Sequence, residues 1–181
     1  KNIFEFVSKF PIKIRSLPNI AKLLTSSNLT DNLINREPSS FLGRDNIDIG
    51  TKLYSDNYEG KNILVTGGGG SIGSELCKQI IKLNPLSLVI LEHSEINLYN
   101  IISTIQEDCA KENIKLIPKL GSVLDGDLVE NILIKSEVNV VLHAAAYKHV
   151  PLVQENVIQS FNNNVVSTET LVNLCIKNNI E

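Results

Sequence analysis

Methionine is absent from this 181-residue sequence, cysteine is scarce and long apolar runs are missing. Because Lys1 rather than methionine comes first, we expect the natural protein to begin upstream of it. The three cysteines, Cys77, Cys109 and Cys175, are widely spaced and form no Cys-x-x-Cys pair. This spacing favours apolar free thiols in a reducing compartment over disulfides or metal ligands. No stretch approaches the roughly 18 consecutive apolar residues of a membrane-spanning helix, and there is no signal-peptide pattern.

An excess of either charge is also missing. The 17 basic and 20 acidic side chains give a net charge of −3, which leaves no electrostatic footprint for nucleic acid or an anionic membrane. The hydrophobic content of 43% and the charged content of 20% are those of an ordinary globular chain with enough apolar material for one core. We therefore expect a cytoplasmic chain that contacts neither nucleic acid nor a membrane.

A cluster of glycines follows the first strongly apolar run of the chain. Ile63-Leu64-Val65 predicts a buried strand over residues 62–66, and a helical apolar pattern after the glycines predicts a helix over 71–83. Strand, glycine turn and helix in this order are the setting of a dinucleotide-binding fingerprint. The predicted buried face of the helix carries Ile72, Leu76, Ile80 and Ile81.

Three of these glycines, Gly67, Gly70 and Gly73, are spaced three residues apart. In a dinucleotide site the first allows a tight turn, the second lets the backbone approach a pyrophosphate, and the third lets the helix pack against the sheet. The pyrophosphate would lie at the amino end of the helix, beside Ser71 and Ile72, where N–H groups have no intrahelical partner. These five residues are predicted to bind the cofactor.

An acidic residue stands where the same site needs one. Glu92 lies nineteen positions after Gly73, at the end of the apolar run 86–91. There its carboxylate can accept hydrogen bonds from the adenosine ribose hydroxyls, and it repels the 2′-phosphate of NADP. Glu92 therefore favours NAD as the cofactor, while NADP is left open because His93 and its loop could adapt.

Apolar strands alternate with helical patterns over the rest of the chain. The alternation predicts an α/β fold, a Rossmann-type doubly wound parallel sheet with right-handed crossovers. The sequence ends where such a fold would enter its next strand, so we expect a truncated sheet. Residues 1–59 are predicted to form an irregular arm or linker from a preceding domain, with the Rossmann domain over 60–181. The other predicted strands span 87–92, 115–120 and 138–144, and the other predicted helices span 95–111, with Ser94 as its N-cap, 126–135 and about 161–177.

Ser122 and Val123 follow the strand predicted over 115–120. At the carboxyl end of a strand in an open parallel sheet, the Ser122 side chain and the Val123 N–H could reach the adenine edge of the cofactor. In the alternative reading, this loop only caps the next helix.

A second informative stretch follows the strand predicted over 138–144. The small residues Ala144, Ala145 and Ala146 would let a flat cofactor lie against the backbone at the ligand-binding edge of the sheet. Lys148, just beyond them, could meet a phosphate or hydroxyl of a nucleotide sugar. Near the start of the last helix stand Asn162, Asn163 and Asn164; they are either helix caps, or one of them faces the active-site strand and fixes backbone carbonyls or a water.

Together these segments resemble one family. Thr66–Cys77, Leu91–Glu95 and above all His-Ala-Ala-Ala-Tyr-Lys-His-Val-Pro-Leu-Val (143–153), with Asn-Asn-Val at 163–165, are similar to the polysaccharide-biosynthesis nucleotide-sugar 4,6-dehydratases. These are extended short-chain dehydrogenase/reductase enzymes of the UDP-N-acetylglucosamine 4,6-dehydratase type. The resemblance covers nearly the whole chain and is strongest over 61–168. This sequence departs from the family in having Ser122 for a usual Asp, Gln154 for a common Glu and Ser167 for a usual Gly.

The resemblance implies a redox-neutral lyase reaction with a tightly held NAD. Hydride leaves C4 of the sugar and returns to C6, and one water is lost, during surface polysaccharide or glycan biosynthesis. UDP-N-acetylglucosamine is the implied substrate, with Lys148 and Asn164 near it or supporting its site. A homo-oligomer is also expected, from a parent protein that segments outside this sequence could hold at the cytoplasmic face of the inner membrane.

The catalytic residues of the family are expected after Glu181. Its Ser-Thr-Asp-Lys segment and the Lys of its Tyr-x-x-x-Lys motif belong to the next strand and helix, and the adjacent pair Tyr147-Lys148 has the wrong spacing to replace them. We therefore expect residues 1–181 alone to be inactive. Two alternatives stay open: a nucleotide-sugar 4-epimerase or reductase on the same fold, and an NAD(P)-binding module without catalysis.

Overall fold

The computed structural model describes residues 57–180 and two dipeptides nearer the amino terminus. The chain separates into two compact units, Lys1–Asp48 and Ile49–Glu181. In the first unit, β1 (Arg15–Ser16) pairs antiparallel with β2 (Ile34–Asn35). The rest of the predicted arm up to residue 56 lies outside the described residues, so its irregular form stays a prediction.

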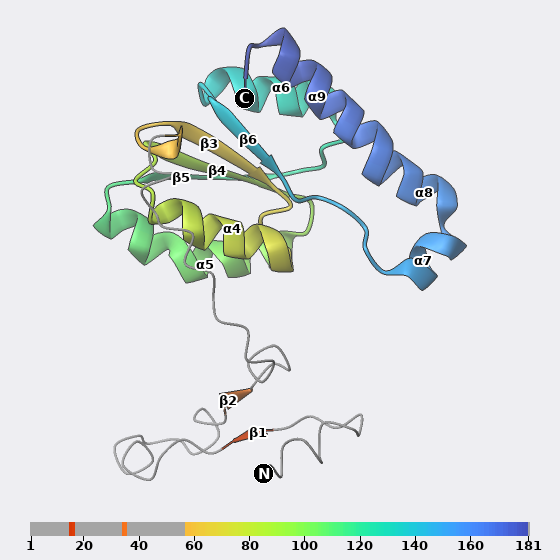
Figure 1. Ribbon diagram of the computed structural model, residues 1–181, viewed down its shortest axis with the longest axis horizontal. Helices are drawn as coiled ribbons and strands as arrows, with labels where there is room; N and C mark the ends of the chain where they lie inside the picture. Colours follow the sequence, from red (N-terminus) through yellow and green to blue (C-terminus); the bar gives the residue numbers. More distant parts are fainter. Residues whose placement is uncertain (1–14, 17–33, 36–56, 181) are drawn as a thin grey trace. The chain divides into compact units, whose positions relative to one another are not determined.

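The second unit is built on a four-stranded parallel sheet with the strand order β5-β4-β3-β6 (Figure 1). The central strand β3 pairs with β4 on one side and β6 on the other. The strand order therefore reverses beside β3, and such a switch point at the carboxyl ends of parallel strands is where open α/β sheets bind ligands. The strands are β3 (Asn62–Thr66), β4 (Ser87–Glu92), β5 (Lys115–Leu120) and β6 (Val140–His143).

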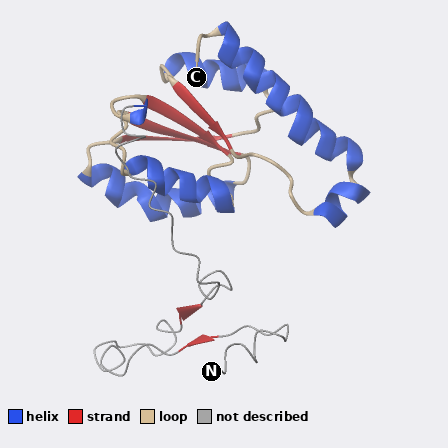
Figure 2. Ribbon diagram, in the orientation of Figure 1, coloured by secondary structure: helices blue, strands red, loops and turns tan. Residues whose placement is uncertain are grey.

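Helices cover both faces of this sheet (Figure 2), which confirms the predicted Rossmann-type α/β fold. α4 and α5 lie on one face, and α6 and α9 lie on the other (Figure 1). The helices are α4 (Ser71–Ile81), α5 (Glu95–Lys111), α6 (Gly126–Lys135), α7 (Val150–Glu155), α8 (Val157–Phe161), the π-helical turn η2 (Asn162–Val166) and α9 (Ser167–Lys177).

Each face of the sheet has its own apolar core. Successive side chains of β3 alternate between them: Ile63 and Val65 join the core under α4 and α5, and Leu64 joins the core under α6 and α9. Every residue of β4 is buried, as expected of a strand between two neighbours and two helical layers. Cys77 and Cys109 fill the first core, and burial raises the pKa of the Cys77 thiol to about 12.

The first helix differs from its prediction in extent and in face. Ile72 is 66% exposed, so its predicted place on the buried face is wrong, and Leu76 is only partly buried. α4 ends at Ile81 rather than at residue 83 because the chain then turns through Asn84, whose φ of +51° is not helical. The buried residues of the first two turns are instead Gly73 and Cys77.

The carboxyl-terminal elements also differ. The fourth strand is shorter than predicted, covering Val140–His143 rather than 138–144. The helix predicted over 161–177 starts earlier, at Val157, and is interrupted by the π-helical turn. The sequence analysis did not predict α7, although Pro151 lies in its first turn, a position that suits proline because the N–H there needs no helical partner.

Candidate nucleotide-binding site

The glycine turn between β3 and α4 is closed by contacts that leave no room for side chains. Gly67 has a φ of +64°, and a Cβ placed on it would lie 2.7 Å from the Cα of Ala145. A Cβ on Gly73 would lie 2.1 Å from the carbonyl oxygen of Gly67. Gly73 therefore lets the first turn of α4 lie directly against the glycine turn that follows β3.

The amino end of α4 has no side-chain cap. Its N-cap is Gly70, which is extended and makes no side-chain hydrogen bond, and its backbone N–H donates to the Gly67 carbonyl at 3.0 Å. Ser71 and Ile72 follow on the exposed side of the helix. An uncapped helix amino end carries partial positive charge and unpaired N–H groups, which together favour an anion.

Glu92, at the end of β4, is 3% exposed and already holds two backbone amides. Its Oε2 accepts a hydrogen bond from Gly69 N at 3.0 Å, and its Oε1 accepts one from Ser94 N at 3.0 Å. The Nδ1 of His93 lies 3.1 Å from the same Oε1. The carboxylate thus fixes the glycine turn relative to the start of α5. The sequence analysis gave Glu92 only a ribose contact and missed this role.

A narrow hollow beside the turn brings several predicted residues together. Its lining includes Gly67, Ser122, Val123 and Ala145. The Ser122 hydroxyl accepts a hydrogen bond from Leu124 N at 3.2 Å, so it closes its own turn. Helix capping falls to a different residue of this loop, because the Asp125 side chain accepts from Leu128 N at the start of α6.

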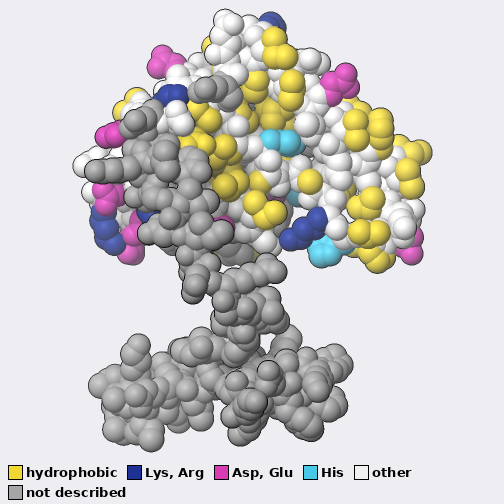
Figure 3. Space-filling model, viewed as in Figure 1, with side chains coloured by type: hydrophobic (Ala, Val, Ile, Leu, Met, Phe, Trp, Pro, Cys, Tyr) yellow, Lys and Arg dark blue, Asp and Glu magenta, His cyan; other side chains and the backbone are white. Residues whose placement is uncertain are grey.

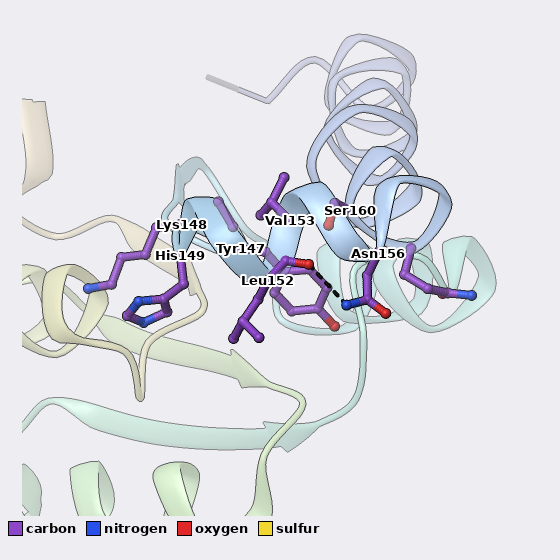
Figure 4. Close-up of a pocket in the computed structure, with 9 residues that line it drawn as sticks. Tyr147, Lys148, His149, Leu152, Val153, Asn156 and Ser160 are labelled. Atoms are coloured by element: carbon purple, nitrogen blue, oxygen red, sulfur yellow. Dashed lines mark hydrogen bonds between the residues drawn. The ribbon is translucent and has the colours of Figure 1, made fainter.

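A larger groove lies between the loop of residues 144–149 and the helices α7 and α8 (Figure 4). Its volume is about 460 Å³, and its lining combines the loop residues from Ala146 to His149 with Leu152, Val153, Asn156, Gln159 and Ser160. In Figure 4, Lys148 and His149 extend to one side of the groove and Asn156 lies at the other. The Lys148 Nζ comes within 3.4 Å of Ser71 Oγ, so this cation lies at the uncapped end of α4.

Asn164 lies in the π-helical turn and caps no helix. Its Oδ1 accepts from Tyr147 N at 2.8 Å, and its Nδ2 donates to Tyr147 O at 3.0 Å. Of the two roles that the sequence left open, the structure has the second, because the side chain fixes backbone of the 144–149 loop.

His143, the last residue of β6, makes contacts that the sequence analysis did not consider. Its Nδ1 lies 2.6 Å from Thr66 Oγ1, and its Nε2 lies 3.0 Å from Thr168 Oγ1. Burial lowers the pKa of the imidazole. The sequence does carry a signal for such a role, because a polar residue that ends an otherwise apolar strand often forms hydrogen bonds inside the protein.

Hydrophobic side chains gather on the surface over α7 and α8 (Figure 3). The most exposed of them are Val150, Leu152, Val157, Ile158 and Phe161. Within residues 57–180 and the two dipeptides, no group of His, Cys, Asp and Glu side chains has the arrangement of a metal site. In the same part of the chain, no helix is both long and apolar enough to cross a membrane.

The switch point, the glycine turn and the buried acidic residue at the end of β4 define an α/β protein with a Rossmann-type fold. Residues 63–181 match the family described as "Polysaccharide biosynthesis protein", and the chain belongs to this family. The capsular polysaccharide biosynthesis protein CapD of Staphylococcus aureus is 32% identical over 160 residues, which cover 88% of this chain and 26% of CapD.

A second relative carries an enzymatic name. The UDP-N-acetylglucosamine 4,6-dehydratase (inverting) of Campylobacter jejuni (strain 81-176) is 28% identical over 125 residues, covering 68% of this chain and 35% of that enzyme. The chain thus spans about a quarter to a third of the length of these two relatives.

Solved structures share the fold. Pen from Bacillus thuringiensis has a TM-score of 0.60 at 24% identity, over 68% of this chain and 36% of Pen. UDP-glucose-4-epimerase from Stenotrophomonas maltophila, solved with bound NAD, has a TM-score of 0.56 at 22% identity, over 67% and 35% of the two chains. At this level of identity the likeness concerns the backbone arrangement.

Proposed function

We propose that this chain is the cofactor-binding part of a nucleotide-sugar 4,6-dehydratase that uses NAD and acts on UDP-N-acetylglucosamine. Membership of the polysaccharide biosynthesis family supports the class of reaction. The name of the Campylobacter jejuni relative supports the substrate. The observation that carries the proposal is structural: an uncapped helix end, a glycine turn too tight for side chains and a buried carboxylate meet at the switch point of the sheet.

The residues at this edge fit a dinucleotide. The pyrophosphate would lie on the N–H groups of Ser71, Ile72 and Gly73, where neither a capping side chain nor a Cβ on Gly70 competes for the space. The adenosine would enter the hollow beside Ser122 and Val123, with its ribose toward Glu92.

The nicotinamide end would lie along Ala144, Ala145 and Ala146, which line the carboxyl end of β6 with small side chains. NAD, when bound, supplies a hydride acceptor that becomes the hydride donor later in the same turnover. These three residues contribute a flat surface, and they place no large side chain beside the turn at Gly67.

The nucleotide sugar would occupy the groove beside α7. Lys148 supplies a positive charge at the end nearest the glycine turn, and the amides of Asn156 and Gln159 supply hydrogen-bonding groups farther along. Asn164 supports this site indirectly, since its side chain forms hydrogen bonds with the backbone of Tyr147. Lys148 is therefore the proposed substrate contact and Asn164 its support.

NAD is proposed over NADP because the Glu92 carboxylate would face the ribose of a cofactor bound in this way. A 2′-phosphate there would meet a negative charge that is 3% exposed, so water screens it little. His93 is the nearest group that could offset this repulsion. The cofactor preference is checked by titrating the protein with NADH and with NADPH.

The proposal is tested by mass spectrometry of UDP-N-acetylglucosamine incubated with the full-length protein and NAD. Loss of one water, without accumulation of NADH at 340 nm, is the expected result, because the hydride returns to the sugar within one turnover. An unchanged mass together with a new chromatographic peak would indicate epimerisation instead. No conversion despite NAD binding would leave a cofactor-binding module and overturn the dehydratase proposal.

A further inference from the structure

A continuous line of hydrogen bonds runs from the glycine turn to the loop that carries Lys148. It begins at Thr66, the residue before Gly67, and passes through the ring of His143 to Thr168 in α9. The Thr168 hydroxyl donates to the carbonyl of Asn164 at 2.8 Å. The line joins the carboxyl ends of β3 and β6 to the π-helical turn.

Counting protons along this line shows which ring nitrogen of His143 must carry a hydrogen. A threonine hydroxyl has one proton, and the Thr168 hydroxyl uses it in the hydrogen bond that it donates to the carbonyl of Asn164. Toward His143, Thr168 can therefore only accept, so Nε2 must carry a hydrogen. A neutral ring then has a lone pair on Nδ1, which accepts the proton of the Thr66 hydroxyl at 2.6 Å.

The surroundings favour the neutral ring. Thr66 is fully buried, and the two ring nitrogens face threonine hydroxyls rather than a carboxylate. Burial lowers the pKa of His143, in keeping with a ring that does not carry charge at neutral pH. A charged ring would also leave Thr66 without an acceptor for its proton at this position.

The line continues into the proposed substrate groove. Asn164, whose carbonyl receives the Thr168 proton, holds both backbone groups of Tyr147 with its side chain. Lys148 follows directly and reaches Ser71 at the amino end of α4. Movement of the His143 ring would therefore shift both the glycine turn and the loop that carries Lys148.

We propose that His143, held as the neutral Nε2–H tautomer, is a positioning residue that sets the glycine turn and the Lys148 loop relative to each other. Its functional consequence rests on the proposed function, whereas its tautomer does not. The ring touches neither cofactor nor substrate in this assignment; it acts through Thr66 on one side and through Thr168 and Asn164 on the other.

The tautomer is tested by long-range ¹H–¹⁵N NMR of the full-length protein at neutral pH. The chain has three histidines, so the signals are assigned by single substitutions. His143 should show an unprotonated Nδ1 and a protonated Nε2, and the Nε2–H proton should exchange slowly with solvent. T168V removes the acceptor for Nε2–H at nearly constant volume, and it should abolish this fixed pattern, while T168S should restore it. T170V, the same change two residues along α9, is the matched control and should leave the pattern unaltered.

The coupling is tested by kinetics of the same variants. T168V removes both hydrogen bonds of the Thr168 hydroxyl, to His143 and to the Asn164 carbonyl. It should raise KM for the nucleotide sugar about three- to tenfold, which corresponds to the free energy of one neutral hydrogen bond, with the NAD dissociation constant changed less. T66V, on the other side of the ring, should weaken NAD binding by a similar factor. T168S and T170V should behave as wild type.

The outcomes separate the two proposals. An Nδ1–H tautomer, or a ring that averages both tautomers in the wild-type protein, would overturn the inference whatever the activity. A fixed Nε2–H ring with T168V and T66V kinetically silent would overturn the positioning role. A fixed ring in a protein without turnover would contradict the proposed function and leave the tautomer assignment in place, with NAD affinity in T66V deciding the positioning role.

Discussion

The side chain of Asn164 closes both backbone hydrogen-bonding groups of Tyr147, accepting from its N–H at 2.8 Å and donating to its carbonyl at 3.0 Å. The amide thus pairs with this residue as a neighbouring strand would. Because the 144–149 loop belongs to no helix or strand, this contact substitutes for the missing ladder. The position of Lys148, the next residue, depends on it.

Replacing Asn164 with aspartate should therefore damage the loop. The variant keeps an acceptor for Tyr147 N–H, but it loses the donor and sets a carboxylate oxygen against the Tyr147 carbonyl. We expect a loss of about 1–2 kcal/mol in the free energy of unfolding, measured in urea. N100D, the same change on the exposed face of α5, is the control and should cost little. Equal stability of the two variants would contradict the role given to Asn164.

Gly60 and Gly67 both have a positive φ but differ in the space around them, so alanine substitutions at the two positions distinguish the cost of backbone strain from the cost of steric overlap. Gly60 (φ +69°) has no atom within 4 Å of a built Cβ, whereas at Gly67 (φ +64°) that Cβ would lie 2.7 Å from Ala145 Cα. G60A should cost roughly 1–2 kcal/mol, from the left-handed backbone alone. G67A should cost about 2–5 kcal/mol, because overpacking adds to the same strain. Thermal unfolding followed by circular dichroism measures both, and a G67A variant no less stable than G60A would contradict the geometry of the turn.

Glutamine at position 92 should loosen the glycine turn. Glu92 accepts from Gly69 N and from Ser94 N through different oxygens, and glutamine offers one oxygen and one NH₂ group. One of the two amides then loses its acceptor, which should cost about 1–3 kcal/mol. NAD affinity, measured by calorimetry, should fall as well, because the turn becomes less ordered. E107Q, on the exposed side of α5, serves as the control; an E92Q protein with wild-type stability and affinity would refute the bracing role.

The pKa of His143 predicts how stability depends on pH. Burial lowers this pKa below its ordinary value of 6.5, so the unfolded chain binds a proton that the folded protein does not. The stability that the neutral ring contributes is complete above 6.5 and is lost as the pH falls from there through the folded-state pKa. H143Q should lack this contribution. The difference in unfolding free energy between wild type and H143Q should therefore stay constant from about pH 8 to 6.5 and shrink below 6.5, and a difference that stays constant on further acidification would contradict the assignment.

Much of the fold follows from local pattern. The strands over 62–66, 87–92 and 115–120 and the helices over 95–111 and 126–135 have the predicted bounds, because each is a short, largely apolar run or a regular 3.6-residue pattern. The N-cap prediction for Ser94 is also confirmed, with its side chain accepting from Asn97 N. These features depend on residues within one turn or one strand of each other, so the sequence contains them.

The features that sequence reasoning missed depend on distant residues. Ile72 fits the periodic pattern, but in the first turn of α4 the buried residue is Gly73, and Ile72 is exposed. The brace from Glu92 to Gly69 spans 23 positions, and the bonds of His143 reach Thr66, 77 positions earlier, and Thr168. No local rule predicts such pairs, since they exist only after the sheet has brought its carboxyl ends together.

The π-helical turn at Asn162–Val166 has a consequence for how this site tolerates changes in chain length. A π-turn holds one residue more than an α-turn, and one residue corresponds to a rotation of about 100° around the helix. Because the π-turn takes up its extra residue within about one revolution, deleting Asn162 would let an unbroken α-helix run from α8 into α9 while each helix kept the face that it presents. The same deletion in the regular part of α9 would instead turn the two sides of the break about 100° against each other, so the π-turn is the place in this helical segment where the loss of one residue should disturb the groove least.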